Sequence, residues 1–521
     1  MSFPLMVETA APRVTLRNYF PQPYDSAIAA ARTCYSPTIV TPEQITDKQR
    51  TTIGAATFFG GHHTVYQHAH FEFGLENVSR QFVWSFLHSH PFYNSEQQSQ
   101  RYVRLDRVQA FVPPLEGEAR QLYEAAIERA WVAYRRLSEL LGADTHAILA
   151  DIWHLSEMSH LPAEAGERRR KKVARQAEKK AIETARYVLP VAAFTTMVHT
   201  LSGITLHRLW RMQRTGDTPH EASHVVQQMV ACVREVDPQF FERIGMEPLG
   251  DVELPEWNFL ARGATNGSAP QFDARLNGRT SILVDYSSNA EHIVAEALRA
   301  TLGVSEAEMS DAAAFDALLN PAKNRYRLET LNVAVHSPMM RALHHANYTF
   351  AKRISHTADS QDQRHRMVPA SRPLMLHTDS PPPDTVTPML IRLNPAAREV
   401  FDRAMADAWA AKNRLLELGV PREFALYLLP NATALRFLES GALIHLLHKW
   451  TMRTCFNAQE EIYQASMEEI EEVRRVHPRL ARYLGPPCYL RAGIASPICT
   501  EGSHFCGIKV WLDFPHIPRR I

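Results

Sequence analysis

The segments ETARYVLP, residues 183–190, and EFALYLLP, residues 423–430, decide the predicted fold because they are two versions of one marker. A second pair, HAHFEF at 68–73 and HANYTF at 345–350, occurs in the same order along the chain. Two markers repeated in one order indicate a tandem duplication. The offset between the copies falls from 277 to 240 residues, so the first copy has 37 more residues between its markers.

The chain has 521 residues, which is more than one hydrophobic core usually needs, so at least two domains are expected. Residues 251–279 are rich in Gly, Asn, Ser and Pro and lack hydrophobic periodicity, which predicts a linker. The first copy is then expected in residues 1–250 and the second in residues 280–485. A tail that contains cysteines follows in residues 486–521.

The composition indicates a globular protein with no membrane or nucleic-acid partner. Charged residues make up 22% of the chain and hydrophobic residues 45%, and the net charge is only +1. No apolar run is long enough to cross a bilayer, and the first residues lack the pattern of a secretory signal. Six cysteines are too few for a disulfide scaffold in a chain of this length, so we expect a cytoplasmic protein.

Local patterns predict copies that mix helices and strands. QHAHFEFGL, residues 67–75, alternates like a half-buried strand. ALRFLESGALIHLLHKWTM, residues 434–452, is predicted as one helix, and its apolar face contains Leu435, Leu438, Ala442, Leu446 and Trp450. NAQEEIYQASMEEIEEVRRV, residues 457–476, predicts a further amphipathic helix. The expected fold class is therefore α+β, with a sheet and long helices in each copy.

The segment GERRRKKVARQAEKKAIETARYVLP, residues 166–190, predicts a helix with a dense group of basic residues. We interpret these charges as a solvated helix face. A groove for single-stranded nucleic acid would interleave aromatic residues with the charges, and none interleaves here.

An ordered set of motifs runs through both copies. In the first copy the motifs are GHHTVYQH (61–68), SRQF (79–82), EQQSQRY (96–102) and TARYVLP (184–190). In the second copy they are QRHRM (363–367) and TMRTCFNAQEEI (451–462). In this order, the motifs resemble those of the flavin-dependent thymidylate synthases, and the resemblance covers most of the chain in pieces.

The family pattern is divided between the copies. It combines Gly-His-x-Thr-x-x-x-His, Arg-Gln, an Arg-His-Arg triplet, Glu-x-Ser-x-Arg-Tyr, Ala-Arg-x-x-Leu-Pro and a later helix that ends in Arg. The first copy has His88–His90 in place of the triplet, in the longer loop WSFLHSHPFYN, but keeps the Ser-x-Arg-Tyr end. The second copy has the triplet at residues 364–366 but lacks that end, and Leu426 stands where the first copy has Arg186.

Two further departures concern the later helix. Arg214 in the first copy matches the family's helix arginine only with a shift of one residue, and we interpret it as a relic of a decayed second site. Ala442 and His448 occupy the places of the family's asparagines, which affects the expected flavin contacts.

The resemblance implies one composite site, with nucleotide held mainly by the first copy and FAD mainly by the second. The implied substrate-binding residues are Gln81, Gln97, Ser99, Arg101, Arg186 and Arg453. Among them, Ser99, Arg101 and Arg453 are the expected catalytic residues. The implied cofactor-binding residues are Thr64, His68, Arg364, His365 and Arg366. Guanidinium groups suit a nucleotide phosphate because they donate bidentate, charge-assisted hydrogen bonds.

The resemblance also implies the reaction. It is the reductive methylation of dUMP at C5 to give dTMP, with FAD as cofactor and NADPH and methylene-tetrahydrofolate as cosubstrates. A homodimer with four copies would mimic the family's tetramer. Two alternatives stay open: alkylation of another pyrimidine nucleotide, and a non-catalytic protein that binds flavin or nucleotide.

The tail contains half of the chain's cysteines. Three thiolates and an imidazole can form a closed tetrahedral zinc site, although the spacing lacks a close Cys-x-x-Cys pair. The predicted structural zinc ligands are Cys488, Cys499, His504 and Cys506. The alternative is a small tail whose cysteines are buried or free.

Overall fold

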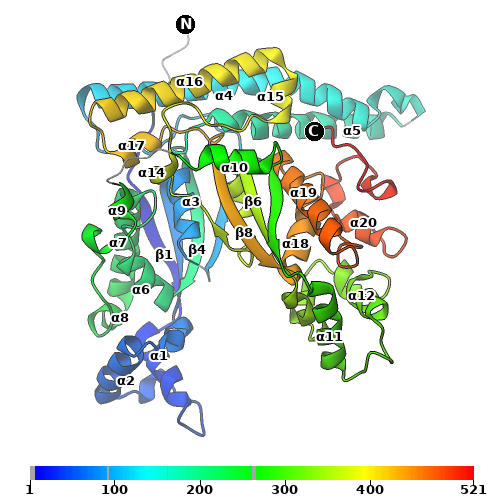
Figure 1. Cartoon of the computed structure of the whole chain (residues 1–521). Helices are drawn as coiled ribbons and strands as arrows, with labels where there is room; N and C mark the ends of the chain where they lie inside the picture. The colour runs from blue at the N-terminus through cyan, green and yellow to red at the C-terminus, as the bar shows by residue number, and fades with distance from the viewer. Residues whose placement is uncertain (1–5, 91–92, 161, 261–265) are drawn as a thin grey trace.

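The computed structural model describes residues 6–90, 93–160, 162–260 and 266–521. The first residues of the first copy and parts of the predicted linker and of the loop WSFLHSHPFYN lie outside the described residues. Two antiparallel sheets lie side by side, and long helices run across one end of both (Figure 1). No helix within the described ranges is long and apolar enough to cross a membrane.

The two sheets have the same strand order. The first is ordered β1-β2-β4-β3 and the second β5-β6-β8-β7, and all neighbouring strands are antiparallel. The strands of the first sheet are β1 (Arg13–Tyr19), β2 (His70–Ser79), β3 (Tyr93–Gln97) and β4 (Phe194–Ser202). Those of the second are β5 (Ser281–Tyr286), β6 (Asn347–Ser355), β7 (Ala370–Ser371) and β8 (Ala434–Ala442). This repeated topology confirms the α+β fold and the tandem duplication.

The predicted single helix at 434–452 is wrong in its first half. Strand β8 (Ala434–Ala442) comes first, and helix α18 (Leu443–Arg453) follows. The burial of β8 has period two: Leu435 and Phe437 are buried, whereas Leu438 is 39% exposed. Pairing with two neighbouring strands outweighed the helical spacing of these apolar residues.

The first copy has 37 more residues between its markers than the second, and its helices in this region are correspondingly longer. Helices α4 (Gly117–Ile152) and α5 (Ala163–Ala185) form a long hairpin in the first copy. Their counterparts, α16 (Pro395–Glu417) and α17 (Arg422–Leu426), are much shorter. α16 packs along α4, so residues of both copies share one buried cluster (Figure 1). The predicted helix at 457–476 is present as α19 (Glu460–Val476).

The remaining helices flank the sheets and connect these elements. In the first copy they are α1 (Pro23–Thr33), α2 (Asp47–Phe59), α3 (Arg80–His88), α6 (Gly203–Arg211), α7 (Pro219–Val236) and α8 (Gln239–Glu242). Between the copies lie α9 (Trp257–Leu260) and α10 (Ala269–Leu276). In the second copy and tail they are α11 (Ala290–Leu302), α12 (Asp311–Leu319), α13 (His356–Asp362), α14 (Met375–Thr378), α15 (Met389–Leu393) and α20 (Pro487–Arg491).

The two versions of the marker segment pair with each other across a pseudo-twofold axis. Val191 N–H donates to Leu429 at 2.8 Å, and Asn431 N–H donates to Leu189 at 2.9 Å. A second symmetric pair of bonds, at 3.0 and 2.9 Å, joins Ala192 to Tyr427 and Ala432 to Tyr187. Each pair relates residues by the same 240-residue offset that the markers show. The repeat therefore forms the junction between the copies.

Two buried carboxyl groups reinforce this junction symmetrically. Glu221 accepts hydrogen bonds from the Ser79 amide at 2.7 Å, the Ser79 hydroxyl at 2.6 Å and the Tyr427 hydroxyl at 2.7 Å. The symmetric set consists of Glu461, Ser355 and Tyr187. Burial raises the pKa of Glu221 to about 7 although the three donors lower it. Each carboxyl thus connects a strand end of its own copy with a tyrosine of the other.

Candidate functional site

A cavity of about 910 Å³ lies between the copies. The first copy contributes residues 96–102 to its lining, and the second contributes segments of 357–368 and α18. Eight of the eleven predicted substrate and cofactor residues line this one cavity. They are Gln97, Ser99, Arg101, Arg186, Arg364, His365, Arg366 and Arg453.

The other three predicted residues lie elsewhere. Gln81 is buried on α3, where its side chain meets His356 at 3.0 Å and the Met375 sulfur at 3.3 Å. Thr64 and His68 are exposed on the 3₁₀ turn His63–His68 and do not line the cavity. Asn332 and Val335 of the second copy line the cavity, although neither was predicted.

Four guanidinium groups line the cavity without an ion pair among the described side chains: those of Arg80, Arg186, Arg366 and Arg453. Burial lowers the pKa of Arg80 to about 9 and that of Arg453 to about 10, and it also lowers the pKa of Arg186. The buried Nε atoms of Arg80 and Arg186 have no hydrogen-bond partner within the described part of the chain. Desolvated cations of this kind are stabilised by an anion. The Arg-Gln motif contains Arg80, but the resemblance implied a substrate contact only for the adjacent Gln81.

The Arg-His-Arg triplet spans the gap between the copies. Arg364 donates to Glu96 at 2.7 Å, and Arg366 donates to the Tyr93 carbonyl and to Asn94. His365 Nε2 accepts from Arg453 Nε at 2.8 Å. Burial and the neighbouring Arg453 hold the pKa of His365 well below its usual value, so the imidazole is neutral. His365 thereby orients Arg453 toward the cavity. The two arginines of the triplet connect the second copy with strand β3 of the first.

Amide side chains supply the neutral polar part of the lining. The Gln97 Oε1, the Gln100 Nε2 and both polar atoms of Gln361 are buried without a hydrogen-bond partner among the described residues. Such groups match the donors and acceptors of a pyrimidine ring edge. Gln100 and Gln361 were not predicted, because an isolated glutamine carries no motif.

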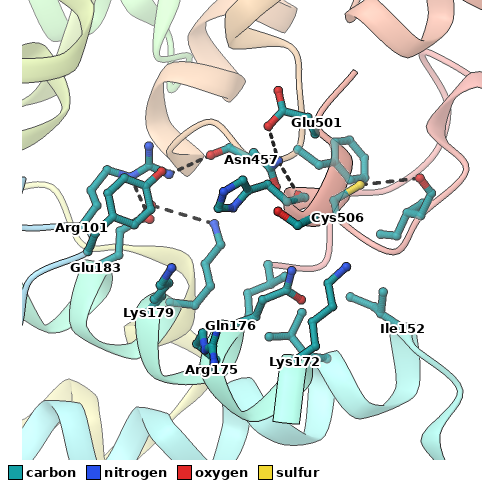
Figure 2. Close-up of a pocket in the computed structure, with 18 of the residues that line it drawn as sticks. Arg101, Ile152, Lys172, Arg175, Gln176, Lys179, Glu183, Asn457, Glu501 and Cys506 are labelled. Atoms are coloured by element: carbon teal, nitrogen blue, oxygen red, sulfur yellow. Dashed lines mark hydrogen bonds and ion pairs between the residues drawn. The ribbon is translucent and has the colours of Figure 1, made fainter. Parts of the chain in front are cut away.

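Arg101 is already paired. Its Nε donates to Glu183 at 2.9 Å and its Nη2 donates to the Asn457 carbonyl at 2.7 Å (Figure 2). Burial would raise the pKa of Glu183, but Arg101, Lys180 and Arg186 together lower it to about 2. Arg101 therefore lines the cavity as a guanidinium whose charge is largely compensated by Glu183.

The repeat relates the cavity to a second position in the other half of the molecule, and side chains fill that position. His88 aligns with Arg364 at an offset of 276 residues, the same offset as Ser79 and Ser355. Trp84 Nε1 donates to Asp359 at 2.8 Å, and Arg372 binds the same carboxylate at 2.8 and 2.9 Å. The His88 ring packs on Trp84 with ring centres 4.7 Å apart. Arg214 lies apart from both places in an exposed ion pair with Asp251.

The predicted zinc ligands do not all face one place. Cys488, Cys499 and Cys506 line a small cavity of about 10 Å³, and Cys455 of the second copy lines it with them. His504 instead lines the larger cavity beside α5. In the described part of the chain, no three metal-ligating side chains are already arranged to hold an ion. The ligand set with His504 therefore does not fit the structure.

Residues 15–239 and 282–479 match the family of the thymidylate synthase complementing protein, Thy1. The chain belongs to the Thy1 family. The two separate matches confirm that it contains two Thy1 copies. The chain is a methyltransferase enzyme.

Relatives of the Thy1 chain include three flavin-dependent thymidylate synthases. The one from Clostridium tetani is 29% identical over 46% of this chain and 88% of its own length. Those from Sulfolobus acidocaldarius and Sulfurisphaera tokodaii are 38% and 37% identical over 28% of this chain and 57% and 58% of their own lengths. The solved structure of the UMP/dUMP methylase PolB from Streptomyces cacaoi is 16% identical, with a TM-score of 0.32, over 46% of this chain and 100% of that chain.

Proposed function

We propose that the cavity between the two copies binds dUMP and FAD, and that the chain methylates dUMP at C5 to give dTMP. The observation that carries this proposal is the convergence of Arg80, Arg186 and Arg453, all desolvated and without ion pairs among the described residues, on one cavity. A nucleotide phosphate supplies the anion that these groups lack.

The first copy provides most of the nucleotide subsite. Arg186 and Arg80 bind the phosphate, while Gln97 and Gln100 meet the edge of the uracil ring. Arg453, oriented by His365, lies where a cation stabilises negative charge that develops on the ring when C5 becomes nucleophilic. Among the described residues that line this cavity none is a cysteine, and the proposed mechanism relies on positioning and electrostatics.

The second copy provides the flavin subsite. Arg364, Arg366 and His448 line the same cavity, and Asn332 brings an amide group from a segment outside the family motif. This donor set suits the phosphates and the ring edge of FAD, although Ala442 replaces one of the family's asparagines. FAD, when bound, supplies the hydride, while methylene-tetrahydrofolate supplies the carbon and NADPH the reducing equivalents.

The proposal extends to the organisation of the protein. One working site per chain follows from the filling of the symmetric position by Trp84 and His88. A homodimer would then carry four copies and two sites, in the cytoplasm. The proposed copy boundaries, 1–250 and 280–485, enclose the two segments that match the family.

A binding measurement tests the proposal. The visible absorption spectrum of FAD is recorded with the purified chain, before and after addition of dUMP. We expect a bound-flavin spectrum that shifts when dUMP is added, because both ligands share one cavity. A spectrum that stays that of free flavin in both samples contradicts the proposal. Replacing dUMP with UMP shows whether the site distinguishes a ribose, which has a 2′-hydroxyl group, from a deoxyribose.

The zinc ligand set predicted from the sequence included His504; we propose instead that Cys455 completes the set with the three tail cysteines. A zinc ion would draw the four thiols that surround the small cavity together into a Cys₄ site. We expect about one zinc ion per purified chain by elemental analysis, lost in Cys455→Ser and retained in His504→Ala. A chain without zinc, or loss of zinc in His504→Ala alone, contradicts this ligand set.

A further inference from the structure

A second cavity, of about 860 Å³, adjoins the proposed nucleotide site. Arg101 and Tyr102 line both cavities, so the two spaces meet at this pair. Figure 2 shows α5 with Lys172, Gln176 and Lys179 on one side of the hollow and the segment with Asn457, Glu501 and Cys506 on the other. The basic helix is thus one wall of a cavity that the tail closes, rather than a fully solvated face.

The charge of this cavity is strongly unbalanced. Eight Lys or Arg side chains and two Glu side chains line it. Lys172 and Lys179 form no ion pair within the described ranges. Their Nζ atoms lie over aromatic rings instead, Lys172 at 4.1 Å from the centre of Trp153 and Lys179 at 5.3 Å from that of Tyr102. These cations are free to bind an anion from outside the chain.

The cations form a row rather than a cluster. Arg168, Lys172 and Lys179 follow one another at positions i, i+4 and i+11 along α5. Neighbouring turns of a helix lie about 5.4 Å apart, so the row extends over roughly 17 Å and ends beside Tyr102. A compact phosphate needs cations that converge on one point, whereas these cations, about 6 and 10 Å apart along the helix axis, match an extended polyanion.

We propose that this row binds the poly-γ-glutamate chain of the folate cosubstrate, whose ring system enters the composite cavity past Tyr102. The proposal rests on the proposed function. An extended γ-glutamyl unit has five backbone bonds and spans about 6 Å, close to one helical turn, with one free carboxylate per unit. The methylene groups of the chain find apolar surface on Leu149, Ile152 and Ile508.

The test is direct binding, which does not depend on turnover. Affinities of the purified chain for tetrahydrofolate with one and with five glutamates are measured by calorimetry in the presence of FAD and dUMP. Because several exposed ion pairs of modest strength add up, we expect the pentaglutamate to bind about tenfold more tightly. The advantage should disappear in Lys172→Ala/Lys179→Ala and should shrink at 0.5 M salt.

A matched control removes two cations that lie outside the cavity, in Arg136→Ala/Arg170→Ala, and it should keep the tenfold advantage. Equal binding of both folates, with normal FAD and dUMP binding, overturns the inference and leaves the proposed function intact. Absence of binding of either folate overturns both. A competition experiment with 2′,5′-ADP adds one more outcome. If 2′,5′-ADP displaces both folates equally from the control variant, whatever their number of glutamates, the row binds phosphates and the inference is overturned.

Discussion

Arg186→Ala should weaken dUMP binding by about 100-fold or more while the fold is retained. The Arg186 guanidinium is buried at the cavity, and its Nε has no partner among the described residues. A buried, charge-assisted contact with a phosphate contributes more than an exposed ion pair, and truncation of such a group typically costs 2–5 kcal/mol, on the order of 30- to 5,000-fold in affinity. The measurement is a titration of flavin absorbance or calorimetry with dUMP.

The control for this prediction is Arg214→Ala. Arg214 lies in the turn after α6, the helix that corresponds to the one carrying Arg453, and it pairs with Asp251 at the surface. Its removal should leave dUMP affinity within a factor of two, because exposed ion pairs contribute little. If Arg214→Ala weakened binding as much as Arg186→Ala, the nucleotide subsite would have to lie in the other half of the molecule.

Lys352→Met should lower the free energy of unfolding by about 3–5 kcal/mol. The Lys352 ammonium is buried and contacts three carboxylates: Asp362 at 3.0 Å, Glu439 at 2.5 Å and Glu469 at 2.7 Å. Among the described residues, Lys449 alone would remain in ion pairs with this cluster, through Asp362 and Glu439. Leaving buried carboxylates without a cation costs far more than the pair itself contributes.

The pH dependence gives this prediction a second readout. In the variant, an uncompensated carboxyl takes up a proton in the folded state, so its folded pKa lies above its unfolded value. The stability of the variant should therefore be nearest to wild type at pH 5 and lowest at pH 8. Thermal denaturation at both values measures the difference. Lys323→Met, which removes an exposed cation paired with Asp316, is the control and should leave the free energy of unfolding nearly unchanged. An effect equal to that of Lys352→Met would contradict the argument from burial.

Asp362 connects this buried cluster to the site. It ends α13, three residues before His365, and the imidazole of His365 orients Arg453. Lys352→Met should therefore also disturb FAD or dUMP binding if the end of α13 moves. Binding measured below the unfolding transition separates this local effect from global instability.

The order of motifs was sufficient to place most of the cavity. Short polar motifs such as EQQSQRY and the Arg-His-Arg triplet are recognisable because they have little amphipathic reason to occur. Repetition at a fixed order also predicted two copies, and the two sheets of equal strand order confirm this. Local pattern was misleading at 434–442, where helical spacing and strand alternation of apolar residues coincide over a short segment.

What the sequence by itself determined is therefore the duplication and the residue types that line the cavity. Only the tertiary structure decided which of these residues meet: Gln81 turns into the core, Glu183 compensates Arg101, and Cys455 joins three tail cysteines. The physical reason is that these contacts join residues far apart in the chain. Their geometry depends on how the two copies pack around the paired segments at 187–192 and 427–432, and no local pattern encodes that packing.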